Sequence, residues 1–306
     1  MSSLTSKHLL GLRDVPAEEI QLILDTAKEM RKILDSDNKK ASHLQGKSVV
    51  TLFYENSTRT RLSFEMASKY LGATAANISA SASSVTKGET LIDTGRTIEQ
   101  MGTDVIVMRH SMSGAPHLLS QYVNCSVVNA GDGMNEHPTQ ALLDMLTILN
   151  HKGSLKGLRV AITGDILHSR VARSNIWGLQ KMGAEVVVSS PSTLLPASIE
   201  QTGVRLAKDV TEAVQGADVV MGLRLQLERQ KKALFPTGRE YSKYFGIDPE
   251  VLSHADKDCI VLHPGPVNRG LELSTSVIDA DNSVINEQVH SGVAVRMAVL
   301  HLLTSK

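Results

Sequence analysis

The sequence of 306 residues has no net charge, no long apolar run and only two cysteines. Its 32 basic residues balance 32 acidic ones, without the basic excess typical of nucleic-acid-binding proteins. No apolar run approaches the ~20 residues of a membrane span, and the N-terminus lacks the apolar core of a signal peptide. Cys125 and Cys259 have neither metal-ligand spacing nor a disulfide framework, and their apolar surroundings indicate buried thiols. These absences predict a cytoplasmic protein that binds neither nucleic acid nor membranes.

Two nucleotide-binding fingerprints are also missing. Gly164 follows the apolar run 160–163, where a dinucleotide fold would carry Gly-x-Gly-x-x-Gly, but the two further glycines are absent. No Gly-x-x-x-x-Gly-Lys-Ser/Thr segment occurs either. The sequence therefore excludes a nicotinamide dehydrogenase and a P-loop nucleotidase.

Short apolar runs alternate with helical patterns after residue 46, which indicates parallel sheets covered by helices. We expect strands near residues 48–53, 104–108, 126–129, 158–163, 185–189, 218–222 and 259–262. We expect helices from residue 15 onward and at 59–71, 90–101, 115–123, 138–150, 169–182 and 286–303. The alternation of apolar runs and helical patterns begins again near residue 155, which favours two domains over one domain with a large sheet. The predicted fold is α/β with two domains, each a parallel sheet covered by helices on both faces, comprising residues 1–138 plus 286–306 and residues 139–285.

The most informative segment is Ser57-Thr58-Arg59-Thr60-Arg61, between an apolar run and a helical stretch that ends at Gly72. A helix N-terminus offers free backbone N–H groups and the positive end of the helix dipole. Hydroxyl groups add neutral donors, and a guanidinium group matches the geometry of phosphate. The segment predicts a phosphate site, and the alternative is an ordinary Ser/Thr cap followed by solvated arginines.

Two further groups stand at predicted strand or helix ends. Arg109 follows the apolar run 104–108, and ligands of parallel sheets gather at the carboxyl ends of strands. His137 precedes Pro138 at a helix start, where the dipole favours a neutral imidazole, and Gln140 lies one turn further on the same face. Each has a structural alternative: a local ion pair for Arg109 and a helix cap for His137.

Later segments supply groups suited to carboxylates and amides. Arg170 starts a helix after the turn at Gly164, and Arg224 and Gln226 share one face of an extended segment, so that they suit a carboxylate. The loop His263-Pro264-Gly265-Pro266 is rigid, and its carbonyl groups are acceptors for an ammonium or amide.

The small, polar segment 79–86 predicts a mobile loop. Lys87, at its end, either reaches a bound anion as part of a lid or belongs to a solvated surface loop. Taken together, these groups suit a substrate that carries a phosphate and carboxylates. The inventory contains neither a carboxylate pair nor a metal cluster, and hydrolysis by a metal or a nucleophile does not fit it.

These residues resemble the aspartate and ornithine carbamoyltransferase family over nearly the whole chain. Phe53 through Arg61 is similar to the family's carbamoyl-phosphate motif, and His137-Pro138-Thr139-Gln140 to its second motif. Ornithine enzymes carry His-Cys-Leu-Pro where this chain has 263–266. The His-Pro-x-Pro form, Ser83 through Glu89 and Arg224-Leu225-Gln226 resemble the aspartate branch.

The resemblance implies transfer of a carbamoyl group from carbamoyl phosphate to L-aspartate, in pyrimidine biosynthesis and without a cofactor or metal. The domain of residues 1–138 plus 286–306 would bind carbamoyl phosphate, and that of residues 139–285 would bind aspartate. The implied phosphate ligands are Ser57, Thr58, Arg59, Thr60 and Arg109. Thr60, Arg109 and His137 would polarise the carbamoyl oxygen, and Gln140 with the carbonyls of Pro264 and Gly265 would hold the carbamoyl nitrogen. Aspartate would be bound by Lys87, Arg170, Arg224 and Gln226.

The resemblance also implies a homotrimer with shared active sites, in which Ser83 and Lys87 come from a neighbouring subunit. Glu55 and Arg229 would form interdomain contacts. Val171 departs from the threonine of the regulated enzymes and resembles unregulated bacterial trimers. Two other hypotheses are carbamoyl transfer to another amine and a non-catalytic scaffold. The sequence leaves open whether regulatory chains or a dihydroorotase associate.

Overall fold

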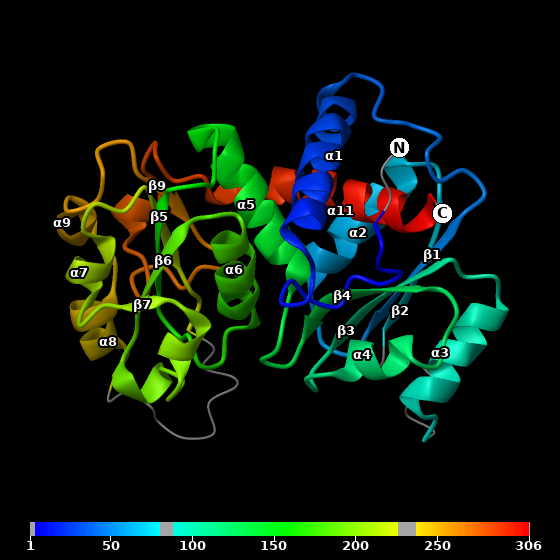
Figure 1. The fold of residues 1–306 in the computed structure, drawn as a ribbon, viewed down its shortest axis with the longest axis horizontal. Helices are drawn as coiled ribbons and strands as arrows, with labels where there is room; N and C mark the ends of the chain where they lie inside the picture. Colours follow the sequence, from blue (N-terminus) through cyan, green and yellow to red (C-terminus); the bar gives the residue numbers. More distant parts are fainter. Residues whose placement is uncertain (1–3, 80–87, 226–236, 306) are drawn as a thin grey trace. The chain divides into compact units, whose positions relative to one another are not determined.

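A computed structural model describes residues 4–79, 88–225 and 237–305 of the chain. These residues form two compact units (Figure 1). Unit 1 comprises residues 1–146 and 290–306, and unit 2 comprises residues 147–289. The division falls within two helices, α5 (Pro138–Lys152) and α11 (Ile285–Thr304). Both helices therefore contribute residues to each unit.

Unit 1 contains a four-stranded parallel sheet of order β2-β1-β3-β4. Its strands are β1 (Ser48–Phe53), β2 (Thr74–Ser79), β3 (Val105–His110) and β4 (Ser126–Asp132). Its other helices are α1 (Ala17–Asp35), α2 (Thr58–Tyr70), α3 (Leu91–Gln100) and α4 (Ala115–Ser120). In Figure 1, α3 and α4 lie on one side of this sheet, and α1, α2 and α11 lie on the other.

Unit 2 contains a five-stranded parallel sheet of order β7-β6-β5-β8-β9. Its strands are β5 (Arg159–Thr163), β6 (Glu185–Ser189), β7 (Arg205–Leu206), β8 (Val219–Gly222) and β9 (Ile260–Leu262). Its helices are α6 (Arg170–Lys181), α7 (Val210–Val214), α8 (Gly238–Phe245), α9 (Pro249–Leu252) and α10 (Thr275–Ile278), and two 3₁₀ turns occupy Ser192–Leu194 and Ile199–Thr202.

Both faces of each sheet are buried, as the near-continuous apolar strands predict. In unit 1, Ile106 and Met108 of β3 pack with Leu119 of α4, whereas Val105 and Val107 bury the opposite face. Alternate residues of the unit 2 strands likewise pack against α7 or are buried on the other side. The predicted fold class, with two covered parallel sheets, is confirmed.

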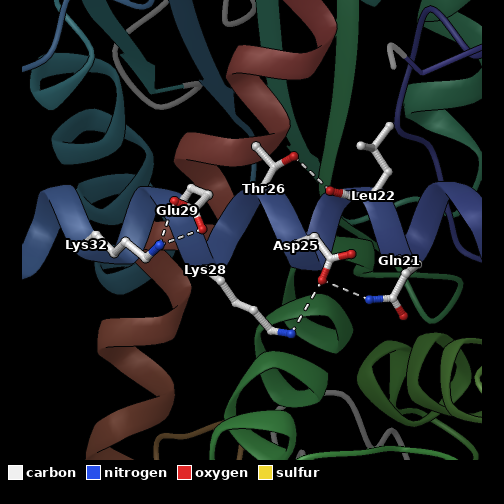
Figure 2. Close-up of polar contacts among 7 residues, drawn as sticks. All are labelled: Gln21, Leu22, Asp25, Thr26, Lys28, Glu29 and Lys32. Carbon is white, nitrogen blue, oxygen red and sulfur yellow. Dashed lines mark hydrogen bonds and ion pairs between the residues drawn. The ribbon is translucent and has the colours of Figure 1, made fainter. Parts of the chain in front are cut away.

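The exposed face of α1 carries polar pairs one helical turn apart (Figure 2). Lys32 Nζ lies 2.8 Å from Glu29 Oε1, and Gln21 Nε2 donates to Asp25 Oδ1 at 3.0 Å. Such exposed pairs contribute only about 0.2–0.5 kcal/mol each. The opposite, apolar stripe of α1, which includes Ile20 and Leu24, is buried and holds the helix in the unit.

The predicted strands are confirmed, but two edge strands escape prediction. β2 reads Thr-Ala-Ala-Asn-Ile-Ser and pairs only with β1, and β7 spans two exposed residues. Neither has the apolar run that marks a strand buried on both faces. Ser79, expected in a loop, ends β2, and residues 80–86 of that expected loop lie outside the described residues. The short helices α7 to α10 were also not predicted, because helices of 4–8 residues show little periodicity.

The two cysteines are buried and unbonded, as expected. Burial raises the pKa of Cys125 and of Cys259 to about 12, so both thiols stay protonated near neutral pH. Among the residues that the structure describes, no helix combines the length and apolar character needed to cross a membrane.

Gly164, the single glycine after β5, is required by close packing. Its φ is +122°, and a Cβ there would lie 2.9 Å from the carbonyl oxygen of Leu223, which follows β8. We expect Gly164→Ala to lower the free energy of unfolding by about 3 kcal/mol, since it combines backbone strain with overpacking.

Gly157 is the matched control, because its φ is +82° and nothing lies within 4 Å of the added Cβ. Gly157→Ala should cost only about 1–2 kcal/mol, the strain alone. Urea unfolding of both variants measures the difference, and equal losses would contradict the close approach at Leu223.

Candidate functional site

The first turn of α2 follows the carboxyl end of β1. Ser57 occupies the N-cap position, but its side chain makes no capping hydrogen bond, and the first turn contains no acidic residue. Thr58 and Arg59 are exposed, whereas Thr60 is buried. The side-chain cap of the Ser/Thr alternative is thus not formed at Ser57, whereas the exposure of Arg59 agrees with that alternative. Backbone N–H groups at a helix start suit an anion.

Arg109 lies beside this turn because of the strand register. Phe53 at the end of β1 pairs with Arg109 of β3, and the Tyr54 N–H donates to the Arg109 carbonyl oxygen at 2.8 Å. The guanidinium group donates to Glu55 Oε1 at 3.0 Å and to the Ala130 carbonyl oxygen at 3.3 Å. Two contacts thus fix its position at the same sheet edge as the α2 turn.

Glu55 was expected to contact Arg229 of the other domain. In unit 1 it accepts a hydrogen bond from Arg109, and Arg229 lies outside the described residues. The local ion-pair alternative for Arg109 is therefore present. It does not exclude ligand binding, since a guanidinium group has five N–H donors.

His137 and Gln140 lie at the start of α5, which follows β4. The His137 carbonyl oxygen accepts from the N–H of Gln140 at 3.0 Å, so His137 caps the helix and Pro138 begins it. His137 is 4% exposed. Gln140 Nε2 donates to Asp144 Oδ1 at 2.9 Å, and Asp144 is fully buried. Asp144 was not singled out from the sequence, although its spacing of four residues from Gln140 was a readable signal.

In unit 1 the strands β1, β3 and β4 are adjacent and parallel. Their carboxyl ends lead to the α2 turn, to Arg109 and to the loop before His137, respectively. The described unit 1 candidates thus lie at one edge of one sheet, the usual place for a ligand in α/β proteins: Ser57, Thr58, Arg59, Thr60, Arg109, His137 and Gln140.

The same arrangement recurs in unit 2 after the adjacent strands β5, β8 and β9. Arg170 is buried at the first position of α6, and the Ser169 side chain caps this helix by accepting from the Ala172 N–H. Arg224 is half-buried between the buried residues Leu223 and Leu225, as the alternation predicted. Both arginines follow strand ends of this sheet.

The loop after β9 is organised around His263, which is 1% exposed. Its Nδ1 accepts from the Gly265 N–H at 2.8 Å, so the proton lies on Nε2, which is 3.2 Å from Glu272 Oε1. Glu272 Oε1 also accepts from the Asn268 N–H at 2.6 Å. His263 and Glu272 therefore position Pro264 and Gly265, and sequence reasoning did not identify Glu272.

Four predicted site residues, Ser83, Lys87, Gln226 and Arg229, lie outside the described residues. Within the described residues, no group of three or more His, Cys, Asp or Glu side chains is arranged to hold a metal ion.

Comparison with known proteins identifies the family. The model of the aspartate/ornithine carbamoyltransferase carbamoyl-phosphate-binding domain matches residues 7–150, and that of the Asp/Orn-binding domain matches residues 156–303. The aspartate carbamoyltransferase catalytic subunit of Ruminiclostridium cellulolyticum is 71% identical over 304 residues, 99% of this chain and 97% of its own length. That of Caldanaerobacter subterraneus is 60% identical over 300 residues, 98% of each chain.

Solved structures of both branches share the fold. Ornithine carbamoyltransferase from Pyrococcus furiosus has a TM-score of 0.87 at 33% identity, with 99% of this chain and 98% of that chain covered. Aspartate transcarbamoylase from Trypanosoma cruzi, in complex with carbamoyl aspartate and phosphate, has a TM-score of 0.87 at 33% identity, with 97% and 96% covered. The chain belongs to the aspartate/ornithine carbamoyltransferase family.

Proposed function

We propose that this chain transfers the carbamoyl group of carbamoyl phosphate to the amino group of L-aspartate, giving N-carbamoyl-L-aspartate and phosphate for pyrimidine biosynthesis. The observation that carries the proposal is the convergence of the α2 turn, Arg109 and the start of α5 at one sheet edge. The catalytic-subunit relatives at 60–71% identity support the aspartate branch.

Carbamoyl phosphate is bound by unit 1 in this proposal. The side chains of Ser57, Thr58, Arg59 and Thr60, with the free N–H groups of α2, bind the phosphate, and Arg109 bridges phosphate and carbamoyl oxygen. The absence of an acid from the first turn of α2 and the exposure of Arg59 support this assignment.

The carbamoyl group lies toward α5. Thr60, Arg109 and His137 polarise its oxygen, and Gln140 with the carbonyl groups of Pro264 and Gly265 accepts hydrogen bonds from its nitrogen. The amine of aspartate attacks the carbamoyl carbon, a tetrahedral oxyanion forms, and phosphate leaves as the C–O bond breaks. Donors aimed at the oxyanion supply most of the rate acceleration, and each raises kcat by a factor of ~10²–10³. The departing phosphate accepts the amine proton.

Aspartate is bound by Arg170, Arg224, Gln226 and Lys87. Arg170 and Arg224 follow adjacent strands of unit 2, and two cations suit two carboxylates. Two buried acids of this unit are engaged locally: Asp165 lies 2.9 Å from His168 Nδ1, and Glu272 binds His263. A cationic acceptor such as ornithine would need acids that face it, so this arrangement favours aspartate.

We also propose a cytoplasmic homotrimer in which Ser83 and Lys87 complete the active site of a neighbouring chain. The carbamoyl-phosphate domain comprises residues 1–138 plus 286–306, and the aspartate domain residues 139–285. The relatives are named catalytic subunits, so binding of regulatory chains to this chain should be tested. Association with a dihydroorotase is a second interaction to test.

The product identifies the reaction. Purified chain incubated with carbamoyl phosphate and either aspartate or ornithine should form carbamoylaspartate and no citrulline, as measured by mass spectrometry. Citrulline alone would refute the aspartate assignment. No carbamoylated product with any amine, from a folded protein, would favour the scaffold hypothesis.

Arg59→Ala should lower kcat by at least ~10², because one charged donor to the phosphate and its developing charge is lost. Size-exclusion chromatography should show unchanged assembly, since Arg59 is exposed. Turnover near that of the wild type would remove Arg59 from the phosphate site.

Mixed trimers test the shared site. After subunit exchange, an equal mixture of Lys87→Ala and Arg59→Ala chains should recover activity at about a quarter of its sites. A site is intact only where a Lys87→Ala chain supplies Arg59 and the neighbouring Arg59→Ala chain supplies Lys87. A mixture of Arg109→Ala and Arg59→Ala chains is the matched control. In each site, Arg59 and Arg109 come from the same chain, so every chain of this mixture lacks one of the two and no intact site forms. Equal activity of the two mixtures would contradict sharing.

A further inference from the structure

Asp132, the last residue of β4, is a fully buried acid without a role in the proposed reaction. Its two carboxyl oxygens accept hydrogen bonds from N–H groups of four residues, Gly114, Asn129, Asn135 and Glu136. An N–H group only donates, so these contacts require both oxygens to act as acceptors. Burial of an acid is costly unless its oxygens are bonded in this way. The donors therefore show which parts of the chain Asp132 holds.

One oxygen holds the loop that leads from β4 to His137. Asp132 Oδ1 accepts from the Glu136 N–H at 3.1 Å, and the Asp132 N–H donates to the Glu136 carbonyl oxygen at 3.2 Å. The Asp132 carbonyl oxygen also accepts from the Asn135 N–H at 2.9 Å. Glu136 directly precedes His137 in the chain, so these bonds fix the point at which His137 leaves the loop and α5 begins.

The other oxygen holds the loop that follows β3, the strand that carries Arg109. Asp132 Oδ2 accepts from the Gly114 N–H at 2.7 Å, and Gly114 is the N-cap of α4. The two loops are in close contact, because a Cβ on Gly133 would lie 2.7 Å from the Ser113 backbone nitrogen. One carboxylate thus joins the loops of two adjacent strands.

Asn129, which is also fully buried, holds Asp132 in this orientation. Asn129 Oδ1 accepts from the Gly131 N–H at 2.8 Å, and this contact identifies the other atom of the amide as the nitrogen. That nitrogen donates to Asp132 Oδ1 at 2.7 Å and to the Glu136 carbonyl oxygen at 3.3 Å. The side chains of Asn129 and Asp132 and the backbone of Glu136 therefore form one closed hydrogen-bond network.

We propose that Asp132 is a positioning residue for His137. It acts through the backbone of Glu136 and holds the buried imidazole group at the sheet edge where the α2 turn and Arg109 also lie. Placement at this edge matters, because a displacement of about 1 Å can lower the rate by ~10². This inference rests on the proposed function, in which His137 polarises the carbamoyl oxygen.

Asp132→Asn tests the proposal with little change in size. The asparagine side chain offers one acceptor oxygen, so its NH₂ group must face the N–H group of either Gly114 or Glu136, and one loop loses its anchor. We expect kcat to fall by at least ~10-fold. The dissociation constant of inorganic phosphate, measured by calorimetry, should change less than about threefold, because other contacts hold Arg109 and the α2 turn.

Asn135→Ala is a milder second variant. It removes only the side-chain donor that lies 3.1 Å from one oxygen of Asp132 and 3.4 Å from the other, and Asn135 is half-buried. We expect kcat to fall about threefold. This variant decides the question if Asp132→Asn does not fold.

Asp104→Asn is the matched control, because Asp104 lies at the opposite end of the same sheet. Its Oδ2 accepts from the Ser48 N–H at 2.8 Å, and its Oδ1 lies 3.1 Å from Lys47 Nζ. Asp104 thus joins the starts of β1 and β3, as Asp132 joins the loops after β3 and β4. Asp104→Asn should lower Tm and leave kcat unchanged.

Crystal structures of the wild type and of the folded variants measure the position of His137 directly. We expect its ring to shift by about 0.5–1 Å in Asp132→Asn, while the α2 turn stays in place. An unmoved His137, a kcat within about twofold of the wild type, or an equal loss of phosphate binding and kcat would overturn the proposal. Failure of the wild type to form carbamoylaspartate would refute the reaction, whereas the crystal structures would still decide whether Asp132 positions His137.

Discussion

Parallel pairing of the strands is the constraint on which the candidate site depends. In a parallel sheet all strands end at the same edge, so residues far apart in sequence come together there without any direct attraction. The register of Phe53 with Arg109 places a guanidinium group beside the α2 turn. In unit 2 the register of Thr163 with Gly222, and of Met221 with Leu262, brings to one edge the starts of the three loops that lead to Arg170, to Arg224 and through His263.

Three acids orient polar groups at these edges; Asp144 and Glu272 are buried, and Glu55 is half-buried. Asp144 orients Gln140, Glu55 holds Arg109, and Glu272 holds the His263 loop. Each acid is itself held by a donor, which limits the cost of burial. The groups proposed to face substrate are mostly cations and neutral donors, and the three acids contact these groups or the loop that carries them.

The sequence predicted the sheets and most candidate residues for physical reasons. Strands buried on both faces have apolar runs, and functional groups follow those runs directly, as Arg109 follows 104–108. The edge strand β2 has no such run, so its place beside β1 comes from tertiary pairing. Glu272 could not be found in this way, because its partner His263 is identified only by the folded chain. The bounds of the units also differ from the expected 138 and 286, since the division falls inside two continuous helices.

Unit 1 is discontinuous in sequence, and this has a consequence for synthesis on the ribosome. Residues 290–306 belong to unit 1, whereas unit 2 is one continuous segment of residues 147–289. Unit 2 is therefore fully synthesised before unit 1, because residues 290–306 of unit 1 follow it in the sequence. A nascent chain therefore contains α2 and the start of α5 before it contains most of α11, which lies on the same side of the unit 1 sheet as α2. This face of the unit 1 sheet is therefore fully covered only after the whole of unit 2 has been synthesised.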